Sequence, residues 1–248
     1  MADLNKVYNL RPDFPEDASI NIAPDPAYST SELKRLAQAV IHFEPALKAL
    51  APSDWATNIG RKSNWINNPH LGLRNLSRAE SIAHIGTIED SEQPRSVAGL
   101  IQKGRVRNYC WNFTRHVVDP LITYRQIPKC TTSSEMICWI ELVTTFVRAS
   151  IKCDSSVKLQ KVPPNIRGLR WFLLHFAKDE VYPEMARLWA GKDLDAIVEP
   201  SIYIDSDFMT RELSPKAREE RWKELNKLLE DDRKRLEELA RTARPPYW

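Results

Sequence analysis

Residues 107–151 read RNYCWNFTRHVVDPLITYRQIPKCTTSSEMICWIELVTTFVRASI, and this stretch decides the fold. Residues 107–114 and 121–127 mix polar with apolar and aromatic side chains in the alternating way that is typical of strands. The connection between them is short, which favours antiparallel pairing. We therefore predict a pair of strands at the centre of the chain.

The second of these strands would divide its side chains between two faces, because successive residues of a strand point to opposite sides of a sheet. One face would carry Ile122, Tyr124 and Gln126, and the other Thr123, Arg125 and Ile127. Polar groups therefore lie among aromatic ones, which makes this unit the first place to look for a binding site.

A helix follows the two strands. Thr132-Ser133-Ser134-Glu135 has the pattern of a capping box, and the helix it predicts runs to about Ile151. Its apolar face is wide, which indicates a helix buried against the sheet.

The rest of the chain supplies one more strand and several helices. We predict the strand over 18–23, a helix from Thr30 to about Leu50 that Pro45 kinks or splits, and two short helices within 77–103. A linker over 152–164 precedes helices over 165–178 and 183–191. The predicted fold class is α+β, a small and mostly antiparallel sheet backed by helices.

Three segments divide the chain. Residues 1–17 form an irregular lead-in, residues 18–205 the α+β domain, and residues 212–244 a long charged helix with Ser214 as N-cap and Pro215 at its first position. That helix docks on the domain or pairs with a second copy or another protein, so a homodimer or a partner protein are both open.

Residues 52–75, PSDWATNIGRKSNWINNPHLGLRN, fit no helical or strand period. They form either a surface loop or a binding loop. In the second case Asn58, Arg61, Ser63 and Asn64 would offer hydrogen-bonding groups close together, beside the flat side of Trp65.

Composition excludes several classes of protein. The net charge of +3 argues against a dedicated nucleic-acid binder, and the longest apolar runs are too short to cross a membrane. The N-terminus lacks the apolar core of a secretory signal.

The four cysteines lack metal-site spacing and predict reduced thiols in a cytoplasmic protein. Cys130 is the first of them to test as a nucleophile. Glycine-rich phosphate loops are absent.

Residues 18–190 resemble the C-terminal two-thirds of the putative amidoligase family that is widespread in fungi. The matching segments, in order, are SINIAPD, YSTSELKRLAQAVIHFEPALKALAP, ATNIGRKSNW, YCWNF, LITYRQIP and TTSSEMICWIELVTTFVRAS. The family is related to glutamine synthetase and glutamate–cysteine ligases. The resemblance implies half of a glutamine synthetase-like sheet and ATP- and Mg²⁺-dependent joining of a carboxylate to an amine.

This sequence departs from the family at the metal-binding positions. The family's His-x-His strand appears as Ser19-Ile20-Asn21, its strand glutamate as Thr123, and an arginine as Trp55. Nothing in residues 1–17 replaces its paired glutamates. Because Mg²⁺ needs such carboxylates, we predict neither ATP nor Mg²⁺ as a cofactor.

Three functions follow from these features. The first is an amidoligase-derived enzyme of fungal secondary metabolism that condenses, cyclises or isomerises a small molecule. Its catalytic residues would be Tyr124, Arg125 and Gln126, with Tyr124 or a histidine as acid or base. Its substrate-binding residues would be Asn21, Asn58, Arg61, Asn64 and Asn112. The second is an inactive domain that binds a partner, with Arg125 in a structural ion pair. The third is a residual ATP-dependent ligase.

Overall fold

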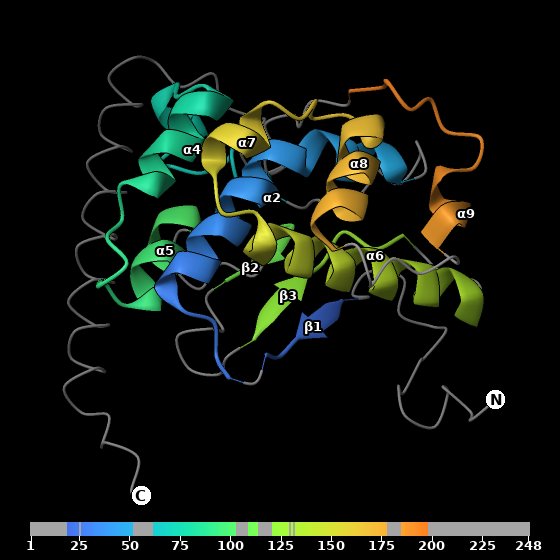
Figure 1. Cartoon of the computed structure of the whole chain (residues 1–248), viewed down its shortest axis with the longest axis horizontal. Helices are drawn as coiled ribbons and strands as arrows, with labels where there is room; N and C mark the ends of the chain where they lie inside the picture. The colour runs from blue at the N-terminus through green and yellow to red at the C-terminus, as the bar shows by residue number, and fades with distance from the viewer. Residues whose placement is uncertain are drawn as a thin grey trace, which may run out of the picture. The chain divides into compact units, whose positions relative to one another are not determined.

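The computed structural model describes residues 19–24, 26–51, 62–102, 109–113, 121–128, 130, 132–177 and 185–197. All of these belong to one compact unit. Helices lie over a small sheet in this unit (Figure 1). The predicted helix over 212–244 lies outside the described residues, as do residues 1–17.

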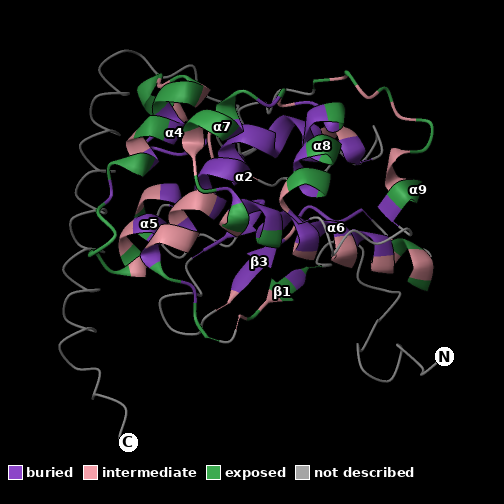
Figure 2. Ribbon diagram, viewed as in Figure 1, coloured by how far each residue is buried: buried purple, intermediate pink, exposed green. Residues whose placement is uncertain are grey.

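The long helix α2 (Thr30–Leu50) runs through the centre of the unit. A capping box starts it: the Ser29 side chain accepts from the Glu32 amide, and the Glu32 carboxylate accepts from the Ser29 amide. Pro45 lies inside the helix without splitting it. Figure 2 shows that α2 is among the most buried elements, and most of its residues from Leu33 to Leu50 contribute to the core.

The sheet has three strands, β1 (Ile20–Ile22), β2 (Trp111–Asn112) and β3 (Ile122–Tyr124). Their order is β1-β3-β2 and both pairings are antiparallel. The α+β class and the antiparallel pairing of the two central strands are therefore confirmed. The strands are shorter than the sequence pattern predicted.

The register places two rows of side chains on opposite faces of the sheet. Ile20, Tyr124 and Trp111 form one row, and Asn21, Thr123 and Asn112 form the other. The alternation predicted for 121–127 stops at Tyr124, where β3 ends. Ile127, which we had placed on the face of Thr123, lies beyond the end of β3 and belongs to the hydrophobic core. A two-residue alternation holds only while the chain stays in the ladder.

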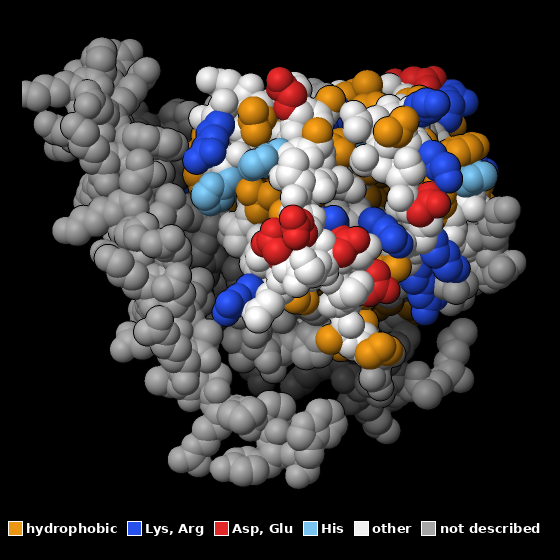
Figure 3. Space-filling model, turned by 60° about the vertical axis from the view of Figure 1, so that its left-hand side comes forward, with side chains coloured by type: hydrophobic (Ala, Val, Ile, Leu, Met, Phe, Trp, Pro, Cys, Tyr) orange, Lys and Arg blue, Asp and Glu red, His pale blue; other side chains and the backbone are white. Residues whose placement is uncertain are grey.

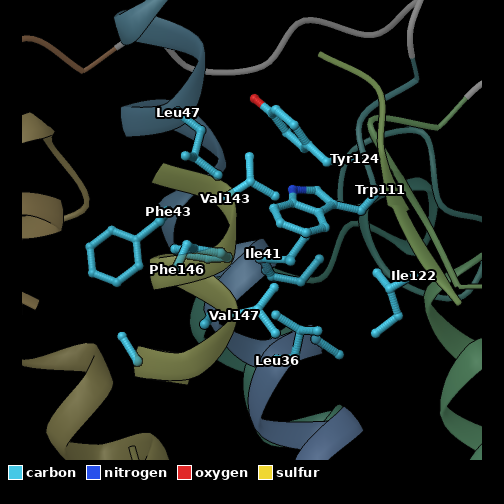
Figure 4. Close-up of a cluster of buried hydrophobic side chains, with 14 of the residues drawn as sticks. Leu36, Ile41, Phe43, Leu47, Trp111, Ile122, Tyr124, Val143, Phe146 and Val147 are labelled. Carbon is cyan, nitrogen blue, oxygen red and sulfur yellow. The ribbon is translucent and has the colours of Figure 1, made fainter. Parts of the chain in front are cut away.

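Helix α6 (Ser133–Lys152) begins at the predicted capping box, in which Thr132 accepts from the Glu135 amide and Glu135 accepts from the Thr132 amide. It packs against α2, α8 and β1. Aromatic rings join the layers: Phe146 of α6 lies 5.5 Å from Trp111 of β2 and 6.3 Å from Phe43 of α2, between ring centroids. Figure 4 shows this core.

Shorter helices surround these elements. They are η1 (Gly72–Arg74), α4 (Arg78–Gly86), α5 (Pro94–Ile101), α7 (Ser156–Gln160), α8 (Ile166–Phe176) and α9 (Ala186–Trp189). The predicted helices over 77–103 and 165–178 are confirmed, and α9 is shorter than the helix predicted over 183–191. Helix α7 was missed, since we read 152–164 as a linker. Across the described part of the chain, no helix combines the length and apolar character needed to cross a membrane.

Candidate functional site

The predicted site residues fall into separate settings. Asn21 and Asn112 share one face of the sheet, whereas Tyr124 points to the other. Arg125 and Gln126 follow the end of β3, and Asn64 lies outside the edge of β2. Asn58 and Arg61 lie outside the described residues. The structure thus does not gather the predicted set in one place.

The row Asn21–Thr123–Asn112 takes one polar residue from each strand. The Thr123 hydroxyl donates to Oδ1 of Asn21 at 2.8 Å, which confirms that these two side chains share a face. Thr123 is 1% exposed and Asn112 3%, whereas Asn21 is exposed. The row therefore runs from the solvent-facing strand β1 into the interior, and it offers only neutral hydroxyl and amide groups.

Tyr124 lies in the core on the opposite face. Its ring is 4.7 Å from that of Trp111 and 6.4 Å from that of Trp139, and its side chain is fully buried. Figure 4 shows Tyr124 beside Trp111. Burial raises the pKa of its phenol well above the ordinary value, which disfavours proton transfer near neutral pH. Since the sheet separates it from Asn21 and Asn112, Tyr124 cannot touch a ligand bound by both.

Arg125 and Gln126 stand where β3 leaves the ladder. The Arg125 amide still donates to the Cys110 carbonyl at 2.8 Å, so the strand direction continues by one residue. The Arg125 side chain is partly exposed, and Gln126 is buried. Arg125 is thus a cation between core and surface, next to the strand that carries Thr123.

Asn64 binds the outer edge of β2. Its Nδ2 donates to the Trp111 carbonyl at 2.9 Å, and its Oδ1 accepts from the Trp111 amide at 2.8 Å. The same edge is bound by the Lys62 carbonyl, which accepts from the Cys110 amide, and by Gln102 Oε1, which accepts from the Phe113 amide. Asn64 is fully buried. Its amide group completes the sheet edge and does not face a substrate.

Glu44 is a buried carboxyl that the sequence analysis did not single out. It is 4% exposed, on the core face of α2. Its Oε2 accepts from the Ser63 hydroxyl at 2.7 Å and its Oε1 from the Asn64 amide at 3.2 Å. The helical period could have found it, because Leu33, Ala37, Val40, Glu44 and Leu47 recur at steps of three and four along one stripe.

Burial and the groups around Glu44 act on the pKa of its carboxyl in opposite directions. Burial raises the pKa of its carboxyl to about 7, against the hydrogen bonds from Ser63 and Asn64 and the positive charge of Arg78, which lower it. The Arg78 guanidinium lies over the Trp65 ring, 4.8 Å from its centroid. Burial dominates, so Glu44 changes charge near neutral pH.

Cys130, the thiol predicted as the first to test as a nucleophile, is not activated. None of the four cysteines, all of which are described, forms a disulfide. Burial, followed by the nearby Glu135 carboxylate, raises the pKa of the half-buried Cys130 to about 11. Because the thiolate is the nucleophile, Cys130 is unreactive at neutral pH in this setting.

The donor groups of the sheet do not fit the family's Mg²⁺–ATP site. The positions that resemble its metal-binding strands carry Asn21 and Thr123, which are neutral, and Arg125 nearby is positive. The described residues contain no cluster of three or more His, Cys, Asp or Glu side chains able to hold a metal.

On the surface in Figure 3, basic side chains lie among acidic ones. Ion pairs join Lys34 with Asp90 and Arg167 with Asp195, at N–O distances of 2.7 and 2.8 Å.

Comparison with known proteins found no matching family model, no matching curated protein and no matching solved structure.

Proposed function

We propose that this chain is an amidoligase-derived enzyme of fungal secondary metabolism that acts on a small molecule without ATP or Mg²⁺. The single observation that carries the proposal is the neutral row Asn21–Thr123–Asn112, which crosses all three strands. In the resembling family, the Thr123 position holds a glutamate. In this chain that position has a neutral hydroxyl in place of the carboxylate. The hydroxyl and amide groups of the row would bind a polar substrate rather than a metal.

Arg125 supplies the positive charge of the proposed site. Its side chain is partly exposed beside the end of β3. A guanidinium recognises a carboxylate through paired, charge-assisted hydrogen bonds. We therefore propose a small substrate that carries a carboxylate, held by Arg125 and by Asn21 at the exposed end of the row. Condensation, cyclisation or isomerisation of such a molecule remain the proposed reactions.

The proposal narrows the set of residues assigned to the site. Tyr124 and Asn64 are excluded as substrate contacts by their burial and by the bonds that Asn64 makes with Trp111. Gln126, which we expected to be catalytic, and Asn112, which we expected to bind substrate, are both buried. We propose structural roles for them in place of direct contact with the substrate. Asn58 and Arg61 stay as proposed substrate contacts.

Further parts of the proposal concern the whole protein. The three strands would correspond to half of a glutamine synthetase-like sheet, and residues 212–244 to a helix that docks on the domain, pairs with a second copy or binds a partner protein. The proposed location is cytoplasmic, in keeping with four cysteines that form no disulfide.

A second candidate is an inactive domain that binds a partner protein. The observation that favours it is the burial of Thr123 and Asn112, which leaves Asn21 as the exposed member of the row. On this alternative, the row and Arg125 stabilise the sheet, and the charged C-terminal segment carries the binding function.

Thermal melting of the full chain separates the candidates. The enzyme proposal expects a higher melting temperature with millimolar glutamate or glutarate in the wild type, the loss of this shift in R125A, and no shift with Mg²⁺–ATP. Stabilisation by Mg²⁺–ATP would instead establish a residual ligase. An equal shift in wild type and R125A would contradict the role of Arg125.

A further inference from the structure

The two edges of the sheet differ in how their backbone groups are covered. Along β2 and the residues beside it, Lys62, Asn64 and Gln102 bond to the outward amides and carbonyls. The other edge is β1, because the strand order is β1-β3-β2 (Figure 1). An edge strand presents a row of amides and carbonyls to which another strand can add. The edge of β1 is therefore the place in this sheet where a further strand can bind.

The hydrogen bonds of Trp111 show which way the backbone groups of β2 point. Its amide and its carbonyl both bond to Asn64, outside the sheet. Successive residues of an antiparallel strand turn these groups to alternate sides. Asn112 therefore turns its amide and carbonyl toward Thr123, the residue opposite it in β3. Thr123 in turn points its own amide and carbonyl toward β2.

The same alternation gives the direction of the backbone groups in β1. The residues of β3 on either side of Thr123 turn their amides and carbonyls toward β1, where Ile20 and Ile22 lie opposite them. Asn21 lies between these two isoleucines and therefore points its amide and carbonyl away from the sheet. Among the described residues neither group has a hydrogen-bond partner. Asn21 is also exposed, so a further strand can reach it.

The sequence around Asn21 favours pairing of β1 with itself. Residues 19–23, SINIA, read nearly the same in both directions: a small residue, Ile, Asn, Ile and a small residue. In an antiparallel pair centred on Asn21, Ile20 faces Ile22 of the second copy, and Asn21 faces its own copy. The segment contains neither a charged residue nor a proline. No like charges therefore meet across the pair, and every outward amide is present.

We propose that β1 pairs with β1 of a second copy of this chain, antiparallel and centred on Asn21. The Asn21 amide of each copy donates to the Asn21 carbonyl of the other, as in a hydrogen-bonded pair of an antiparallel ladder. The contact is isologous and closed, the commonest symmetry of protein dimers. It provides a homodimer contact that does not involve residues 212–244, and it does not depend on the substrate proposed above.

The pairing continues both faces of the sheet into the second copy. Ile22 is partly exposed in a single copy, and it packs beside the partner's Ile20 on the apolar face. On the polar face the two Asn21 side chains meet at the two-fold axis. The row Asn21–Thr123–Asn112 therefore becomes continuous with the same row of the second copy.

Sedimentation velocity of the full chain tests the pairing. The wild type should show a reversible equilibrium between one and two copies from about 1 to about 500 μM. N21P removes the outward amide of each copy and should weaken dimerisation at least about tenfold, because two hydrogen bonds across the axis are lost. The matched control N21A loses the same side chain but keeps the amide, and should dimerise within about threefold of the wild type.

Two charge variants test the position of the axis. N21K places two lysines opposite each other, and N21E two glutamates, so each variant alone should dimerise about fivefold more weakly than N21A. An equimolar mixture should recover the dimer, because a lysine then faces a glutamate. This recovery requires that residue 21 faces its own copy. Because Asn21 is exposed, both substitutions are compatible with the fold even if N21P is not, and circular dichroism checks this.

The second copy is the wrong occupant if the wild type stays monomeric at about 500 μM, and an extended segment of another protein would then be the candidate for this edge. A dimer that N21P and N21A weaken equally would contradict hydrogen bonding through the Asn21 amide. Charge variants that do not recover on mixing would contradict an axis at Asn21. Each of these results would overturn the proposal.

Discussion

The side-chain amide of Asn64 makes two hydrogen bonds with the backbone of Trp111, at 2.9 and 2.8 Å, and so takes the place of a neighbouring strand along the edge of β2. An edge strand otherwise presents unpaired amides and carbonyls. A buried edge must have these groups satisfied, and here one side chain satisfies both groups of one residue.

Asn64→Ala should destabilise the fold strongly. It leaves the amide and carbonyl of Trp111 buried without their partners, which costs about 2–4 kcal/mol for the two groups. Urea unfolding of the full chain measures this loss. The matched control is Q93A, which removes an exposed side-chain amide that makes no capping hydrogen bond and should cost less than about 0.5 kcal/mol. Equal losses of unfolding free energy in the two variants would contradict a stabilising role for the hydrogen bonds between Asn64 and Trp111.

Gly168 permits the close approach of α8 to the preceding loop. A Cβ at this position would lie 1.9 Å from the Pro163 carbonyl oxygen, which is backbone and cannot swing away. G168A should therefore destabilise the protein by about 3 kcal/mol or more. G99A is the matched control, because a Cβ at Gly99 meets nothing within 4 Å and the residue lies in α5. G99A should stabilise by about 0.5–1 kcal/mol, and thermal melts of both variants decide the comparison.

The capping box of α6 should be worth a measurable amount by itself. Thr132→Ala removes the side-chain acceptor of the Glu135 amide and should cost about 1 kcal/mol. Ser133→Ala changes an exposed hydroxyl one residue later, within the first turn, and should change stability by less than about 0.5 kcal/mol. The ratio of the two losses, from chemical denaturation, tests whether the cap rather than the general composition of this turn starts the helix.

Two buried groups should give the stability of the protein opposite pH dependences. Burial lowers the pKa of His42 from 6.5 to about 4, so its contribution is lost as pH falls through this window. Burial raises the pKa of Glu44 from 4.5 to about 7, so its contribution is lost as pH rises. Between pH 4.5 and 6.5 the two trends oppose each other, and the wild-type free energy of unfolding should be nearly level.

Single variants of Glu44 and His42 should each reveal the pH dependence that the remaining group gives to the stability. In E44Q, stability should fall by about 3 kcal/mol as pH drops from 6.5 to 4. In H42Q, it should fall by about 3 kcal/mol as pH rises from 4.5 to 7. Denaturation curves at half-unit pH steps measure both. Parallel curves for wild type, E44Q and H42Q would refute the assignment.

Local patterns predicted the helices well. Helix α2 runs over the predicted residues, and α6 begins at the predicted capping box. These features depend on neighbours three and four positions apart, which the sequence shows directly. The pairing of the two central strands was also predictable, because a short connection leaves few other topologies.

Contacts between distant segments could not be predicted. Asn64 lies 47 residues before its partner Trp111 in the sequence. No hydrophobic periodicity predicts a contact over that separation. The division of the predicted site followed from the register: Thr123 and Tyr124 are consecutive, so one faces Asn21 and the other the core. The helical period already places Glu44 in the apolar stripe of α2, but its contacts with Ser63 and Asn64 join distant segments and could not be predicted.

The central claim is that the polar face of the sheet binds a small carboxylate without Mg²⁺–ATP, and NMR of the asparagine side-chain amides tests it most directly. Glutarate at millimolar concentration should shift the side-chain amide signal of Asn21, with a smaller shift at the buried Asn112, and R125A should remove both shifts. Mg²⁺–ATP should leave both signals in place. Shifts induced by Mg²⁺–ATP, or signals that glutarate leaves unmoved at tens of millimolar, would contradict the claim.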